Sequence, residues 1–92
     1  MKVRFSARAG AHLLGIQEYI RGQNKTAARA VGARIRGAAE VLRFFPHAGR
    51  LGRSEGTYEW AVRGLPYVIV YSVHVAEEEI MVLGVFHCAQ KR

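Results

Sequence analysis

The sequence has 92 residues, of which half are hydrophobic and 23% are charged, and this composition excludes a wholly disordered chain. A chain of this length can bury only one modest core, so we predict a single domain over residues 1–92. Fourteen Lys and Arg oppose seven acidic residues, and eleven of the basic ones precede position 54, so the positive field belongs to the N-terminal half and suits an acidic or nucleic-acid partner. The single cysteine excludes an internal disulfide, and the lack of a signal peptide or of an apolar run of about 20 residues predicts a soluble, cytoplasmic protein without a membrane span.

A strand and two helices are predicted in the first half of the chain. Lys2 to Phe5 alternates basic and apolar residues, as a short strand does. Ser6 is a suitable N-cap for a helix over residues 7–21, with an apolar stripe of Ala9, Leu13, Ile16, Tyr19 and Ile20. Asn24 is a suitable N-cap for a second helix to about residue 44, with an apolar stripe of Ala28, Val31, Ile35, Ala38, Leu42 and Phe45. The short connection predicts an antiparallel helical hairpin.

Three strands are predicted in the second half. Pro46 ends the second helix, and a glycine-rich loop follows over residues 47–56. Residues 57–63 alternate, with Tyr58, Trp60 and Val62 on one side and Glu59 and Arg63 on the other, as in a half-buried strand. Residues 67–73 are apolar on both faces, as in a central strand, and residues 80–86 form the last strand. The predicted order is β-α-α-β-β-β, which is an α+β fold.

Four basic side chains of the second predicted helix share one face. At about 100° per residue they fall within roughly 40° of one another and point away from the apolar stripe. We call them the basic ridge; its members are Lys25, Arg29, Arg36 and Arg43. The basic ridge is either a solvated helix face or a binding surface for an acidic partner.

Four stretches carry a family resemblance. The opening helix has Ser6 before it and contains His12, Leu13, Ile16, Tyr19 and Ile20. The junction after the helices reads Phe45-Pro46-His47-Ala48-Gly49-Arg50-Leu51-Gly52-Arg53. The strands contain Gly56-Thr57-Tyr58-Glu59, then Gly64-Leu65-Pro66-Tyr67-Val68-Ile69-Val70-Tyr71, and finally Val85-Phe86-His87. In this order and spacing, which spans nearly the whole chain, the sequence resembles the RelE/ParE superfamily of toxins from type II toxin–antitoxin systems, and its ParE branch most.

The resemblance implies a fold and a partner. In the fold it implies, the N-terminal helical hairpin packs on a three- to four-stranded antiparallel sheet. The implied partner is a cognate ParD-like antitoxin, which carries a DNA-binding dimerisation domain and an acidic tail that wraps the toxin in a hetero-oligomer. The basic N-terminal half would suit such a tail, and operator DNA would be reached only through the antitoxin. No cofactor is predicted, and no membrane association is expected because the sequence has no long apolar run.

Two mechanisms follow from the resemblance. ParE-like members, often part of plasmid-stabilisation systems, inhibit DNA gyrase by binding. RelE-like members cut messenger RNA in the ribosome, which requires proton transfer and a cation at the scissile phosphate. The candidates for this chemistry are His87, Arg63, Arg53, Lys91 and Arg92. Because Gly84 stands where many ribonuclease members carry arginine, and no tyrosine follows His87, gyrase inhibition is the preferred interpretation and the ribonuclease the alternative.

The candidate residues also have structural interpretations. His87 could pack or cap a strand end, and Arg63 could be solvated at a hairpin. Arg50 and Arg53 could bind the antitoxin or target, or be held by a carboxylate such as Glu59. Trp60 is expected in the core or facing the antitoxin. The histidines show no metal-ligand spacing, so no metal is predicted. A third class, a basic nucleic-acid-binding module, would need aromatic residues among the basic ones, which the basic ridge lacks.

Overall fold

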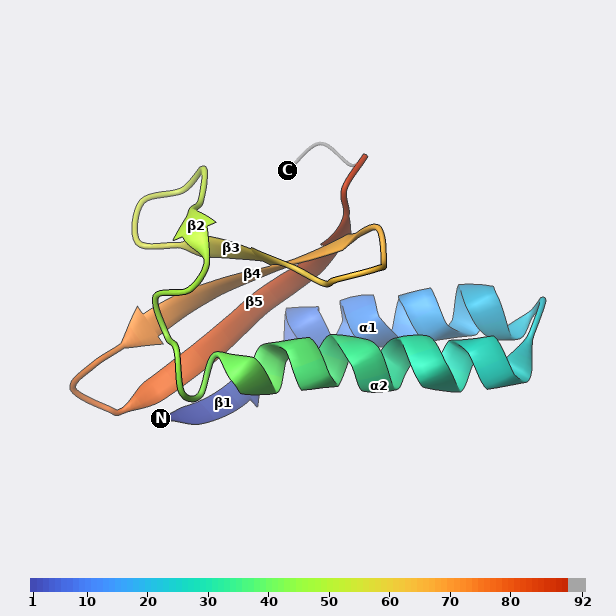
Figure 1. Ribbon diagram of the computed structural model, residues 1–92, viewed down its shortest axis with the longest axis horizontal. Helices are drawn as coiled ribbons and strands as arrows, with labels where there is room; N and C mark the ends of the chain where they lie inside the picture. Colours follow the sequence, from blue (N-terminus) through green and yellow to red (C-terminus); the bar gives the residue numbers. More distant parts are fainter. Residues whose placement is uncertain (90–92) are drawn as a thin grey trace.

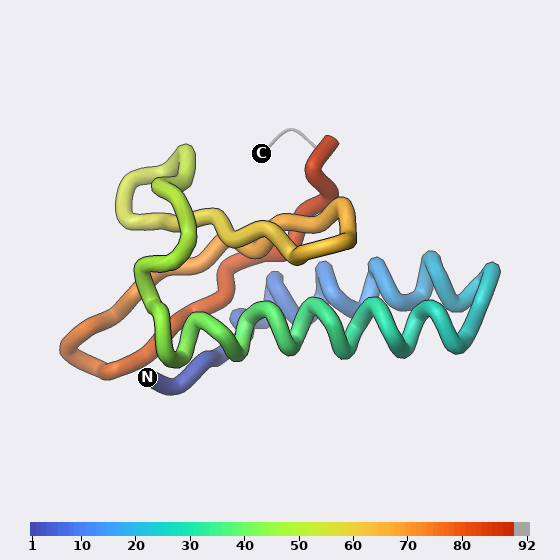
Figure 2. The backbone as a smooth tube through the Cα atoms, viewed as in Figure 1, coloured from blue at the N-terminus to red at the C-terminus, as the bar shows by residue number. Residues whose placement is uncertain are grey.

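The computed structural model describes residues 1–89, which form two helices and five strands. The elements are β1 Lys2–Phe5, α1 Ala7–Arg21, α2 Lys25–Val41, β2 Arg50–Leu51, β3 Tyr58–Ala61, β4 Tyr67–His74 and β5 Glu79–His87. The two helices form an antiparallel hairpin that lies along one face of the sheet (Figure 1). The backbone trace shows the tip of the hairpin extending beyond the sheet, which gives the molecule its 42 Å length (Figure 2).

The five strands lie in the order β1-β5-β4-β3-β2. The α+β fold with a hairpin on a sheet is confirmed, and β4 is the predicted central strand. The sheet differs from the expected three to four antiparallel strands in two details. The first is β2, which has only two residues and so leaves no alternating pattern in the glycine-rich loop. The second is β1, which pairs with β5 in parallel, because the helical hairpin supplies part of the long crossover that parallel strands need.

Both helix starts follow their predicted caps. The Ser6 side chain accepts a hydrogen bond from the Ala9 amide at 3.1 Å, and the Asn24 side chain accepts one from the Ala27 amide at 3.0 Å. However, α2 ends at Val41, earlier than predicted. The following backbone amides bond three residues back, which tightens the last turn and takes the chain off the helix axis. Phe45 therefore leaves the predicted apolar stripe and is 63% exposed, and Tyr19 of α1 is also solvent-facing.

The core lies between the helical hairpin and the sheet. Its largest fully buried side chains come from α2, from the residue that follows it, and from the two central strands: Ile35, Leu42, Ile69, Tyr71, Ile80 and Val82. The Tyr71 hydroxyl donates to the Pro46 carbonyl at 2.8 Å and accepts from the Gly49 amide at 3.0 Å. These two bonds fasten the loop after α2 to the middle of the sheet. Within residues 1–89, neither helix has the length and apolar character needed to cross a membrane.

Candidate functional site

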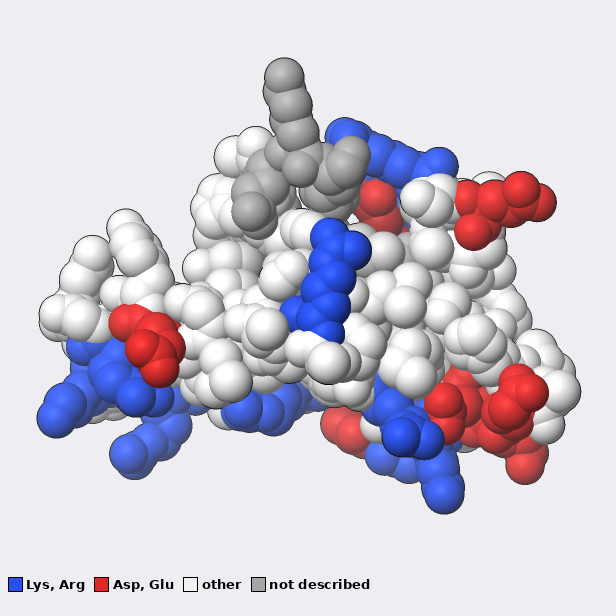
Figure 3. All heavy atoms as spheres, turned by 180° about the vertical axis from the view of Figure 1, so that it is seen from behind, with Lys and Arg blue, Asp and Glu red and all other residues white. Residues whose placement is uncertain are grey.

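The basic ridge is divided in the structure. Lys25 and Arg29 are exposed on α2, at the end of the hairpin where Lys and Arg side chains gather at the lower left of Figure 3. Arg36 instead turns toward α1, where its guanidinium lies 3.5 Å from the side-chain oxygen of Gln17. Arg43 lies beyond the end of α2 and pairs with Glu40 at 2.9 Å. Arg43 lies in the tightened turn that follows α2, and the binding role of the basic ridge stays a prediction.

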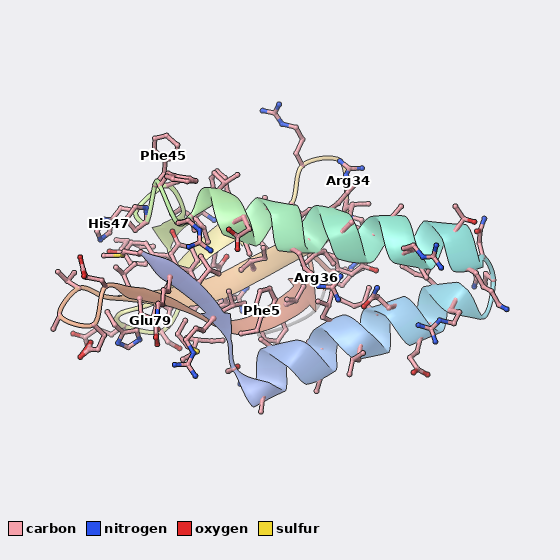
Figure 4. All side chains as sticks on the ribbon, turned by 90° about the horizontal axis from the view of Figure 1, so that it is seen from below. Phe5, Arg34, Arg36, Phe45, His47 and Glu79 are labelled. Atoms are coloured by element: carbon pink, nitrogen blue, oxygen red, sulfur yellow. The ribbon has the colours of Figure 1, made fainter. Side chains whose placement is uncertain are left out.

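An apolar groove opens where the hairpin meets β1. Phe5 and Arg36 lie between α1 and α2 in the view of Figure 4. Nothing lies within 4 Å of the position that a Cβ on Gly10 would take, so the groove is open along α1. Small side chains on that face allow a second chain to approach closely, and Arg36 is the one charged side chain among the described residues of the lining. The lining residues are Phe5, Ala7, Gly10, Ala11, Leu13, Leu14 and Arg36.

The sheet face opposite the core holds a second hollow. Glu59 of β3 lies in it and is only 7% exposed. Arg50 stands opposite Glu59 on β2, with its guanidinium 3.5 Å from the carboxylate. The strand alternation placed Glu59 on the correct side, but its burial could not be predicted without β2. The hollow is lined by Arg8, Arg53, Ser54, Thr57, Glu59, Val70, Leu83 and Phe86.

An aromatic ring covers Gly84, the position at which many ribonuclease members of the resembled superfamily carry arginine. A Cβ on Gly84 would lie only 2.6 Å from the ring of Phe86. The Arg8 guanidinium lies 5.6 Å from the ring centroid, and the His12 ring meets it edge-on at 5.0 Å. Cation–π and aromatic contacts favour this placement of the ring. The space that a longer side chain at position 84 would need is therefore filled by Phe86.

His12 connects α1 to β5 at Val85, which lies past the part of β5 that pairs with β1. The Val85 amide donates a hydrogen bond to Nδ1 of His12 at 3.1 Å, so the imidazole must be neutral and carry its proton on Nε2. Burial, and then the nearby charge of Arg8, lowers the pKa of His12. The sequence analysis named His12 only as part of the opening helix that carries the family resemblance. Its contact could not be predicted because it joins residues 73 positions apart.

The stability of the protein should depend on pH through His12. The folded state favours the neutral ring, whereas an unfolded histidine takes up a proton below pH of about 6.5. The stabilisation is fully present above that value and is lost as the pH falls through the lowered pKa of the folded state. Urea unfolding should therefore show a steeper loss of stability for the wild type than for His12→Gln between about pH 7 and about pH 5. His74→Gln is the control and should keep the wild-type slope; identical slopes for His12→Gln would contradict the assignment.

The described candidate catalytic residues come from the end of β5, the loop after β2 and the turn between β3 and β4. His87 ends β5 and lines a hollow beside α1, and its Nδ1 accepts from the Ala89 amide at 3.1 Å. Arg53 lines the hollow that contains Glu59, which shares Phe86 with the hollow beside His87. Arg63 is exposed in the turn between β3 and β4, where its carbonyl accepts a hydrogen bond from Arg34. Lys91 and Arg92 lie outside the described residues.

Trp60 faces the helices rather than solvent. Its indole nitrogen donates to the Ala38 carbonyl at 3.0 Å, and its ring packs against the core. This geometry agrees with the core interpretation of Trp60. In the part of the chain that the structure describes, no three His, Cys, Asp or Glu side chains gather closely enough to hold a metal ion.

The fold and these surfaces define a class of small basic α+β proteins, in which a helical hairpin lies on a sheet and leaves an apolar groove beside α1. Sequence comparison gives the family. Residues 3–92 match the family described as the ParE toxin of the type II toxin–antitoxin system parDE. The chain therefore belongs to the ParE toxin family of type II toxin–antitoxin systems.

Relatives and solved structures agree with this membership. The chain is 33% identical over 90 residues to Y4kP of Sinorhizobium fredii, named as a candidate toxin, covering 98% of this chain and 91% of Y4kP. It is similar to a chain of the chromosomal ParDE system from P. aeruginosa, with a TM-score of 0.83, 20% identity and 95% of each chain covered. It is also similar to a chain of the toxin–antitoxin complex RelBE2 from Mycobacterium tuberculosis, with a TM-score of 0.63, 25% identity, and 94% and 95% covered.

Proposed function

We propose that this chain inhibits DNA gyrase by binding it, and that a ParD-like antitoxin with an acidic tail neutralises it. The observation that carries the choice of mechanism is the filled space above Gly84, the position at which many ribonuclease members carry an arginine. A cleavage site needs a cluster in which a cation holds the scissile phosphate beside the groups that transfer protons. The ring of Phe86 occupies the space that a cationic side chain at position 84 would need, and the described candidates Arg53 and His87 line two different hollows. Inhibition by binding requires no such cluster, and membership of the ParE family supports the same choice.

The apolar groove and the basic helices support the antitoxin as a partner. An amphipathic tail could place apolar side chains against Phe5, Leu13 and Leu14, and a carboxylate against Arg36. Lys25 and Arg29 would attract further acidic residues of the tail from the exposed face of α2. Such a complex would cover apolar surface that the isolated chain leaves in water. The toxin would then reach operator DNA only through the antitoxin.

Growth assays and a purified gyrase assay test this proposal together. Induced alone in bacteria, the chain is expected to stop growth with filamentation, a DNA-damage response and intact messenger RNA, whereas co-expression with the antitoxin should restore growth. The purified chain should inhibit supercoiling by gyrase. Normal supercoiling together with ribosome-dependent cleavage of messenger RNA would overturn the proposal.

The ribonuclease alternative makes its own prediction about two residues. His87→Ala and Arg63→Ala should then abolish the growth effect, because proton transfer and charge stabilisation at the phosphate would be lost. If the chain inhibits gyrase by binding elsewhere, the same two variants should remain toxic. The pair of variants therefore distinguishes the two mechanisms in one growth experiment.

A further inference from the structure

Three cationic side chains stand at the far end of the helical hairpin. Arg21 ends α1, and Lys25 and Arg29 lie in the first two turns of α2. All three are exposed, and this end of the hairpin extends beyond the sheet (Figure 2). We call these three residues the basic tip. A large partner can therefore approach the basic tip without meeting the sheet.

The charges of the basic tip are not compensated within the described part of the chain. The other arginines of residues 7–43 each contact an aromatic ring, a carbonyl, an amide or a carboxylate of this chain; they are Arg8, Arg34, Arg36 and Arg43. By contrast, no described carboxylate forms an ion pair with the basic tip, not even Glu18, three residues before Arg21. Glu18 is also the one acidic residue among positions 15–33, so three positive charges face one negative charge there. This end of the molecule should therefore attract an anionic partner.

The surroundings of the basic tip favour a nucleic acid over a protein as this partner. The exposed residues between and beside the three cations are small or polar: Gly22, Gln23, Asn24 and Thr26. Protein partners anchor mainly on apolar and aromatic side chains, and the apolar groove is lined by the start of α1 instead. Nucleic acid binds to cations alone, because each neutralised phosphate releases counterions.

The same region favours a duplex over a single strand. Proteins that bind single strands stack the bases on aromatic rings, and residues 20–34 contain no aromatic side chain. The exposed Tyr19 belongs to the hollow beside His87. Lys25 and Arg29 are one turn of α2 apart, about 6 Å along its axis. Because the phosphates of one strand follow at about 3.4 Å along the axis of duplex DNA, these two side chains can reach separate phosphates.

We propose that the basic tip binds the phosphate backbone of duplex DNA without regard to its sequence. The choice of DNA rests on the proposed function, because a toxin bound to gyrase would lie beside the duplex that the enzyme supercoils. The contact would add to the affinity of the toxin for gyrase that holds DNA. An acidic antitoxin tail that reached Lys25 and Arg29 would compete with DNA for them, so neutralisation would also release the toxin from DNA.

Fluorescence anisotropy of a labelled DNA duplex, measured without gyrase over a range of salt concentrations, tests the basic tip. Three phosphate contacts predict a slope of about −2.7 in a plot of log affinity against log salt, or about 40-fold weaker binding when salt is raised fourfold. Arg21→Gln, Lys25→Gln and Arg29→Gln should each make this slope shallower by about 0.9. Lys25→Arg keeps the charge and should keep the slope. Lys2→Gln is the matched control, because it removes an exposed charge from β1 at the other end of the molecule (Figure 1).

The melting temperature of every variant is measured, so that misfolding is not mistaken for lost contact. A wild-type slope in the variant that lacks all three cations, or an equal change in Lys2→Gln, would overturn the basic tip as the DNA contact. Tighter binding of an RNA duplex than of a DNA duplex would reject DNA as the ligand, and loss of antitoxin capture with unchanged DNA affinity would assign the surface to a protein. Supercoiling by purified gyrase tests the proposed function separately. If gyrase remained active while the chain bound DNA with the predicted slope, gyrase would be rejected as the target and the DNA contact retained.

Discussion

Replacing Leu42 with alanine should lower the free energy of unfolding by about 2–5 kcal/mol. Leu42 is fully buried at the C-cap of α2, where it packs between the hairpin and the sheet. Alanine would remove apolar contacts and leave a cavity that the neighbouring Ile35 and Tyr71 could fill only partly. Because small domains are typically stable by only about 5–15 kcal/mol, this one change would bring the chain close to unfolding. Denaturant unfolding followed by circular dichroism measures the loss.

Leu14→Ala is the matched control for this prediction. Leu14 carries the same side chain on α1 but is 59% exposed, so its truncation should change the stability by no more than about 0.5 kcal/mol. A similar loss in the two variants would show that the end of α2 is not part of the core. Leu14→Ala should, however, weaken antitoxin binding if the groove beside α1 accepts the tail.

The end of α2 also shows how far the sequence predicts this fold. The three- and four-residue spacing that identified Ile35 and Leu42 as core residues was correct, because both lie on a regular helix or at its cap. The same spacing failed for Phe45, since the spacing cannot register that the last turn tightens after Val41. Local patterns thus predicted the helices and the central strand, but not the point at which helical geometry ends.

The surfaces were harder to predict than the core, because they depend on contacts between distant parts of the chain. Arg36 was correctly identified as exposed and basic, but its position over an apolar groove depends on how α1 packs. Likewise, Glu59 was expected on the polar side of its strand, but it is buried because β2 pairs beside it. His12 and Phe86 gave no local signal, because their contacts join α1 to the last strand.

Gly49→Ala should destabilise the protein by about 1–3 kcal/mol, the usual cost of overpacking. Gly49 belongs to the junction between α2 and β2, and a Cβ there would lie 2.7 Å from the Glu59 carbonyl and 2.8 Å from the Tyr71 hydroxyl. Since the first neighbour is backbone, the junction must move away from the sheet, which would weaken the Gly49–Tyr71 hydrogen bond and the pairing of Arg50 with Glu59. Thermal and denaturant unfolding both report this loss.

Gly37→Ala gives the opposite expectation for the same chemical change. Gly37 lies within α2, where a Cβ would meet nothing within 4 Å, so alanine should stabilise the helix by up to about 1 kcal/mol. If both variants shifted the free energy of unfolding in the same direction, close packing would not be the reason for a glycine at position 49. Opposite shifts would show that Gly49 is required because the loop there passes within contact distance of the sheet backbone.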